Sequence, residues 1–109
     1  GGFHSSLMRP AAEKFQTVLA GAPIQNAGVT LVGNDAAQPC TSAAQLREEL
    51  AKQITSSVQW VKTIEFMVSQ GVTQFVEIGP GKVLKGLVRK INKDLNVVNV
   101  EKVTDLEQF

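Results

Sequence analysis

The chain has 109 residues and a mass of 11.7 kDa, which is enough for one domain or for part of one. Eleven Lys and Arg side chains nearly balance ten Asp and Glu side chains, so charge does not favour a nucleic acid or a membrane surface as a partner. Apolar residues make up 43%, but no apolar run approaches the roughly 20 residues of a membrane span, and no signal peptide is visible. We expect a soluble, cytoplasmic setting.

The first predicted helix covers residues 6–20, SLMRPAAEKFQTVLA. Ser5 or Ser6 can accept a hydrogen bond from a free N–H group of its first turn. Pro10 is tolerated only near that turn, which places the start of the helix. The helix is expected to end at Gly21. Its apolar stripe consists of Leu7, Ala11, Phe15, Val18 and Leu19.

A short run rich in β-branched residues, VTLVGN at 29–34, predicts a strand, and residues 34–42 are expected to form a loop. Thr41 or Ser42 then caps a helix that runs to about Ile54, because apolar residues recur four apart along it. The single cysteine, Cys40, lies in this loop. One cysteine forms neither an internal disulfide nor a metal site, and no metal site is predicted.

The second half of the chain alternates helices and strands. Residues 58–70 predict a helix, with Gly71 at the position of a left-handed C-cap. Residues 75–78 predict a strand, 82–91 a helix and 96–100 a last strand. Strands separated by helices predict an α/β fold with parallel neighbours. Parallel sheets are normally buried on both faces, so three short strands are expected to be part of a larger sheet.

The turn Gly79-Pro80-Gly81 joins a predicted strand to a predicted helix and can offer N–H groups to an anion. It lacks the longer phosphate-binding fingerprints, and a tight turn with positive φ explains both glycines equally well. A basic cluster follows within the helical stretch, for which a solvated face is the favoured interpretation. The cluster consists of Lys82, Lys85, Arg89, Lys90 and Lys93.

The only histidine is His4, at a junction between loop and helix. An imidazole there has one ring edge open and can be held by a backbone or amide oxygen, as a general base requires. A surface histidine near a chain end is the alternative. Helix capping already explains Ser5 and Ser6, and no serine stands in a G-x-S-x-G elbow. The chain therefore has a candidate base and no candidate nucleophile.

Three segments together resemble one enzyme family. GGFHSSLMRPAAEKF, AKQITSSVQWVKTIEFMVSQGV and FVEIGPGKVLKGLVRKI are similar to the C-terminal portion of malonyl-CoA:acyl carrier protein transacylases. These enzymes load malonyl units in type II fatty-acid synthesis, and related acyltransferase domains occur in polyketide synthases. EIGPGKVL with the basic helix after it is the most specific piece.

The resemblance implies that residues 1–109 are the C-terminal part of an α/β-hydrolase-like large subdomain, with parallel strands and flanking helices. It implies a serine–histidine ping-pong transfer whose partners are a coenzyme A thioester, malonyl-CoA, and the phosphopantetheine thiol of acyl carrier protein, with no further cofactor. The family's serine elbow, malonyl-binding arginine and ferredoxin-like subdomain lie upstream of the position of Gly1. The missing N-terminal part of the same enzyme is therefore an expected partner, and the chain alone is expected to be inactive.

On this template His4 is the base, and Gln53 supplies an oxygen that accepts a hydrogen bond from its imidazole. Phe3 crowds an α-methyl group beside His4 and so favours malonyl over methylmalonyl. Val58 and Val83 are candidate apolar lining of the substrate site, although core packing is the favoured interpretation of both.

Two other interpretations stay open. In the first, the chain is an acyltransferase fragment of a polyketide or other multidomain synthase, although EKVTDLEQF reads as a natural chain end. Alternatively, it is a non-catalytic α/β binding module, which predicts a stable monomer. The transacylase interpretation instead predicts exposed strand edges and an incomplete core.

Overall fold

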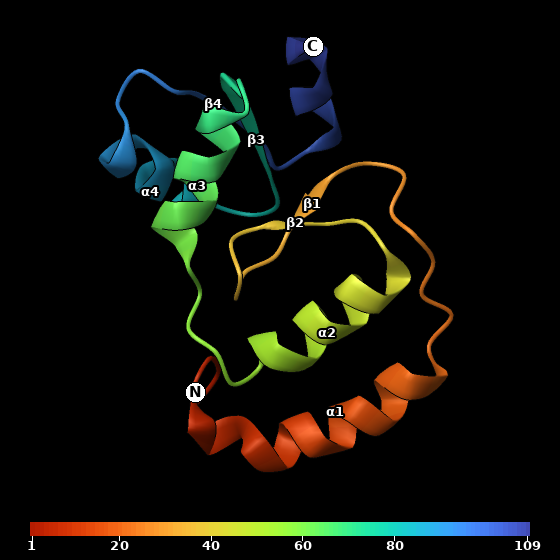
Figure 1. Cartoon of the computed structure of the whole chain (residues 1–109). Coiled ribbons are helices and arrows are strands. Elements are labelled where there is room, and N and C mark those ends of the chain that lie inside the picture. The colour runs from red at the N-terminus through yellow and green to blue at the C-terminus, as the bar shows by residue number, and fades with distance from the viewer. The chain divides into compact units, whose positions relative to one another are not determined.

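The computed structural model describes all of residues 1–109 (Figure 1). The chain divides into two compact units, residues 1–63 and 64–109, and the division falls within helix α3 (Trp60–Ser69). Each unit combines helices with a two-stranded sheet, so the predicted α/β class is confirmed. None of the helices combines the length and the apolar character that crossing a membrane demands.

The N-terminal unit begins with a short 3-10 helix, η1 (Ser6–Met8), which leads into α1 (Arg9–Gly21). The single helix predicted here is thus two consecutive segments, and Pro10 explains why. Proline has no N–H group to donate to the carbonyl of Ser6 in an α-helical turn. The N–H of Arg9 bonds that carbonyl instead, which is the 3-10 pattern.

A β-hairpin follows, formed by β1 (Leu31–Val32) and β2 (Pro39–Cys40) in antiparallel pairing. The prediction was wrong in two respects, because the strand expected over 29–34 is only two residues long and the loop expected over 34–42 contains β2. The chain reverses between them because the N–H of Gly33 donates to the carbonyl of Gln38 at 3.2 Å. β1 therefore pairs within this hairpin and belongs to a different sheet from the later strands.

Helix α2 (Ala43–Gln53) is the central element of the N-terminal unit. A capping box starts it, as the sequence predicted: the hydroxyl of Ser42 accepts from the N–H of Gln45 at 3.2 Å, and the side chain of Gln45 accepts from the N–H of Ser42 at 3.1 Å. α2 packs against α1 (Figure 1). Its Arg47 donates to the carbonyls of Leu19 and Ala22 at the C-terminal end of α1, where a cation is favoured.

The C-terminal unit is built around a parallel pair of strands, β3 (Gln74–Ile78) and β4 (Asn96–Val100). Helix α4 (Val83–Ile91) connects them and packs on β4, and a 3-10 helix, η2 (Val103–Gln108), follows β4. The predicted parallel pairing of these two strands is confirmed. Gly71, after α3, has φ of 87°, as expected for a left-handed C-cap.

A carboxylate of the chain itself binds the N–H groups at the start of α4. The carboxylate of Glu77 accepts hydrogen bonds from the N–H groups of Leu84 at 2.9 Å and Lys85 at 3.0 Å. The side-chain amide of Asn99 donates to the carbonyl of Gly81 at 2.8 Å and so fixes the turn. Because Glu77 already occupies the N–H groups at the start of α4, they are not open to an external anion. Gly79 and Gly81 have φ of 139° and 85°, so the other interpretation, a tight turn with positive φ, is confirmed.

The apolar core is small and leaves apolar side chains on one face of β3 exposed. On β3, Val76 is 43% and Ile78 is 82% exposed. Parallel strands are normally covered on both faces, so this chain alone does not cover its sheet. The buried apolar residues are Ala12, Leu19, Ala37, Cys40, Ile64, Val88, Leu95 and Val97.

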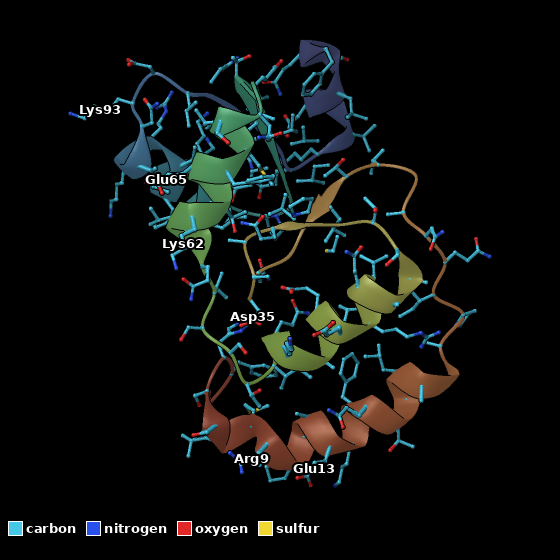
Figure 2. All side chains as sticks on the ribbon, viewed as in Figure 1. Arg9, Glu13, Asp35, Lys62, Glu65 and Lys93 are labelled. Carbon is cyan, nitrogen blue, oxygen red and sulfur yellow. The ribbon has the colours of Figure 1, made fainter.

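Replacing Glu77 with Ala should lower the free energy of unfolding by about 1–2 kcal/mol, because two N–H groups at the start of α4 lose their acceptor. Urea denaturation of the variant and of the unmodified chain measures this difference. Glu65→Ala is the matched control, since Glu65 lies exposed on α3 (Figure 2). Equal losses in both variants would contradict the capping role.

Candidate active site

The imidazole of His4 is held by the C-terminal end of α2, although the two segments are 49 residues apart. The main-chain N–H of His4 donates to the carbonyl of Ile54 at 2.9 Å. Its ring Nδ1 lies 2.8 Å from the carbonyl oxygen of Gln53. A carbonyl only accepts hydrogen bonds, so Nδ1 carries the proton and the lone pair of the neutral ring is on Nε2. His4 is exposed, which leaves Nε2 open to a reacting group.

The backbone of His4 adopts a conformation that is uncommon for a residue with a side chain. Its φ is 62°, in the left-handed region, which costs an L-residue about 1–2 kcal/mol. This turn lets the N–H group and the ring of one residue reach two consecutive carbonyls. The hydroxyl of Ser5 then starts η1 and donates to the carbonyl of Gly2 at 2.7 Å. Such strained positions gather at functional sites.

The electrostatic setting of the ring follows from the helix end. The last carbonyls of a helix have no partner within the helix, and they carry the negative end of its dipole. The carbonyls of Gln53 and Ile54 belong to this end of α2. They place partial negative charge beside the imidazole without a carboxylate next to it.

The structure brings Gln53 to His4, but the atom in contact is the main-chain oxygen. The side-chain oxygen of Gln53 instead accepts from the amide of Asn34 at 3.3 Å. Sequence reasoning missed both Asn34 and Ile54. The one signal for the carbonyls was that a helix predicted to end near residue 54 must leave acceptors unpaired there.

The three predicted substrate residues have different surroundings. Phe3 is 65% exposed, and its ring centre lies 6.4 Å from that of His4 with the planes tilted by 57°. Val58 lies in the N-terminal unit and Val83 opens α4 in the C-terminal unit. Their exposed fractions are 37% and 71%. Core packing within this chain, which was the favoured interpretation of both valines, was therefore wrong.

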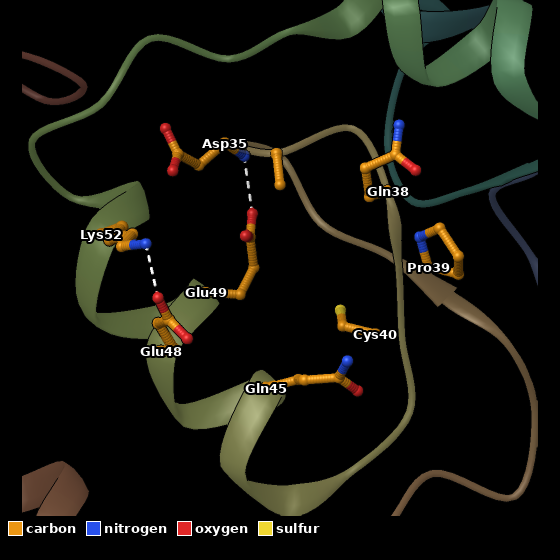
Figure 3. A pocket seen from close by; sticks show the side chains of 9 residues that line it. Asp35, Gln38, Pro39, Cys40, Gln45, Glu48, Glu49 and Lys52 are labelled. Atoms are coloured by element: carbon orange, nitrogen blue, oxygen red, sulfur yellow. Dashed lines mark hydrogen bonds and ion pairs between the residues drawn. The ribbon is translucent and has the colours of Figure 1, made fainter.

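A cavity of about 200 Å³ lies between the hairpin loop and α2 (Figure 3). Cys40 is on its wall, and burial, together with the charge of Glu49, raises the pKa of its thiol. A raised pKa makes a thiol a poor nucleophile. Lys52 pairs with Glu48 at the cavity rim at 2.6 Å, which lowers the pKa of Glu48 and raises that of Lys52. The chain contains no group of three His, Cys, Asp or Glu side chains placed to hold a metal ion.

The known proteins compared with this chain below are all transacylases. No family model matches the chain. A malonyl CoA-acyl carrier protein transacylase of Bacillus subtilis is 43% identical over 107 residues, which are 98% of this chain and 34% of the relative. The crystal structure of a Synechocystis malonyl-CoA:ACP transacylase matches all of this chain and 37% of its own, with 35% identity and a TM-score of 0.94.

The chain is homologous to the C-terminal part of malonyl CoA-acyl carrier protein transacylases. It spans about a third of the length of the curated relatives it matches. A malonyl-transacylase solved in complex with an acyl-carrier protein of a type II polyketide synthase is also similar, with 37% identity, a TM-score of 0.91, and coverage of 97% of this chain and 34% of that one. The resemblance predicted from the sequence is confirmed.

Proposed function

We propose that this chain supplies the histidine base for transfer of a malonyl group from malonyl-CoA to the phosphopantetheine thiol of acyl carrier protein. The observation that carries the proposal is the imidazole of His4, an exposed residue whose ring is bound through Nδ1 to a helix-end carbonyl. The names of the homologous transacylases support the choice of substrate and acceptor.

The proposed reaction has two matched halves. Nε2 of His4 takes the proton of a serine hydroxyl as the serine oxygen attacks the thioester carbonyl, the C–S bond breaks, and the imidazolium protonates the leaving thiolate of coenzyme A. Nε2 then takes the proton of the carrier thiol, the thiolate attacks the malonyl-serine ester, and the imidazolium returns the proton to the serine oxygen. In both halves the carbonyl of Gln53 holds the ring through Nδ1 so that Nε2 faces the reacting groups. These steps use no cofactor.

The serine in this scheme belongs to another part of the enzyme, because none of the serines of this chain stands in an elbow. The chain then corresponds to the C-terminal part of an α/β-hydrolase-like large subdomain, and the pair β3–β4 is part of a larger sheet. The exposed apolar side chains of Val76 and Ile78 support this, since further strands and helices of the same enzyme would cover them.

The basic cluster on and beside α4 is proposed to contact an acidic carrier protein. Lys82, Arg89, Lys90 and Lys93 are exposed, and charge complementarity of this kind speeds and orients docking. The carrier serves fatty-acid synthesis in the first candidate function. Loading of a polyketide-synthase carrier is the second, and the similarity to a transacylase bound to such a carrier favours it. Parallel assays with both carriers separate the two.

A chimaera provides the test of the base. In it, this chain replaces the 107 matched residues of the Bacillus subtilis relative. His4→Ala in the chimaera should slow malonyl transfer about 10²–10⁴-fold, the usual contribution of a general base. Lys14→Ala, an exposed change on α1, is the control and should leave the rate unchanged. A near-normal rate for His4→Ala would refute the assignment.

The 109-residue chain alone should show no malonyl transfer, because it has a base and no elbow serine. The assay measures radiolabelled malonyl groups transferred to carrier protein, with the chimaera as the positive control. Turnover by the chain alone, abolished by His4→Ala, would mean that one of its own serines is the nucleophile.

Phe3→Ser in the chimaera should increase the use of methylmalonyl-CoA relative to malonyl-CoA about tenfold, since making room for one methyl group changes discrimination by about 1–3 kcal/mol. The ratio of kcat/KM for the two thioesters measures it. An unchanged ratio would show that Phe3, despite its position beside the ring of His4, does not limit the size of the acyl group.

A further inference from the structure

Asn34 bridges the two ends of the segment that presents the carbonyls to His4. Its side-chain amide donates to the side-chain oxygen of Gln53, the last residue of α2, at 3.3 Å. Its own carbonyl accepts from the N–H of Gln59, just before α3, at 2.8 Å. The carbonyl of Ile54 lies between these two points in the chain. Asn34 thus closes the α2–α3 connection, residues 54–59, into a loop pinned at both ends.

The hairpin loop that carries Asn34 is itself fixed to α2. Glu49 accepts a hydrogen bond from the main-chain N–H of Asp35 at 2.6 Å (Figure 3). Glu49 and Gln53 are four residues apart, so one face of α2 binds two successive loop residues. Gly33 makes room for this contact, because a Cβ atom there would clash with the side chain of Glu49 in its present position. Asn34 therefore lies in a loop that α2 binds at two successive residues.

We propose that Asn34 is a positioning residue for His4. It makes no contact with the ring and acts through Gln53, whose side chain it binds while the main chain of Gln53 binds Nδ1. This inference rests on the proposed role of His4 as the base. Asn34 holds the end of α2 so that two carbonyls face one left-handed residue, and loss of its amide lets the α2–α3 connection shift away from the ring.

Loss of the Asn34 amide should lower the rate of malonyl transfer and leave the binding of malonyl-CoA unchanged. Asn34 reaches no reacting atom, so the affinity for malonyl-CoA should not change. A base whose ring is less well oriented transfers protons more slowly, since small displacements of reacting groups have large effects on rate. The loss of rate should depend on the side chain of Gln53, because the amide of Asn34 bonds that side chain, and the carbonyl of the same residue bonds the ring of His4.

The test compares variants of the chimaera. Asn34→Ala should lower kcat about tenfold while KM for malonyl-CoA stays within about twofold. Asp35→Ala is the matched control: its carboxylate points away from Glu49 (Figure 3), and its main-chain bond to Glu49 is kept. Asn34→Asp should recover most of the rate, because the amide of Gln53 can turn and donate to the new carboxylate.

Gln53→Ala and the double variant with Asn34→Ala complete the cycle. The double variant should be no slower than the slower single one, since both changes remove the same hydrogen bond. Three outcomes would overturn the positioning role. They are effects of the two changes that multiply, a rise in KM in place of a fall in kcat, and a normal rate for Asn34→Ala. His4→Ala separates this failure from that of the proposed function, because a severe loss in His4→Ala beside a normal Asn34→Ala refutes only the inference about Asn34.

Discussion

The pair of carbonyls at the C-terminal end of α2 is the contact on which the candidate site depends. These two oxygens, of Gln53 and Ile54, hold the ring and the backbone of His4. The rest of the N-terminal unit keeps the helix end in place: a capping box starts α2, Arg47 ties it to the end of α1, and Glu49 ties it to the hairpin loop. A left-handed backbone at His4 is tolerated because these contacts compensate for its cost.

A carbonyl orients an imidazole differently from a carboxylate. In a triad that ends in aspartate, the third group carries a full negative charge. The carbonyl of Gln53 carries none and only accepts hydrogen bonds, so it selects the tautomer of the neutral ring that is protonated on Nδ1. The contact therefore fixes the orientation of the ring without a charged partner.

Local patterns in the sequence predicted most of the elements. Periodicity and capping residues placed α2 behind Ser42, and Gly71 was expected where the left-handed residue after α3 stands. The prediction failed where contacts are not local. The strand β2 is two residues long and exists only through its pairing with β1. Glu77 caps a helix seven residues away, across a turn whose shape the sequence does not specify.

In the candidate site, too, local features were predictable from the sequence and contacts between distant segments were not. A lone histidine beside a helix start was recognisable as a candidate base, and the family resemblance pointed to Gln53. Side-chain identity says nothing about which main-chain oxygen a fold presents, so the acceptor in contact with the ring was visible only in the structure. The same holds for Asn34, an unremarkable loop residue until its partners at both ends of the α2–α3 connection are known.

The most direct test of this account is the tautomer of His4. The sequence has one histidine, so the two imidazole nitrogens in an ¹⁵N-labelled sample of the chain are assigned without ambiguity by NMR. The account predicts that the neutral ring carries its proton on Nδ1, that this proton exchanges slowly with water, and that Nε2 is unprotonated. A proton on Nε2, or a ring that exchanges freely between both forms, would contradict it.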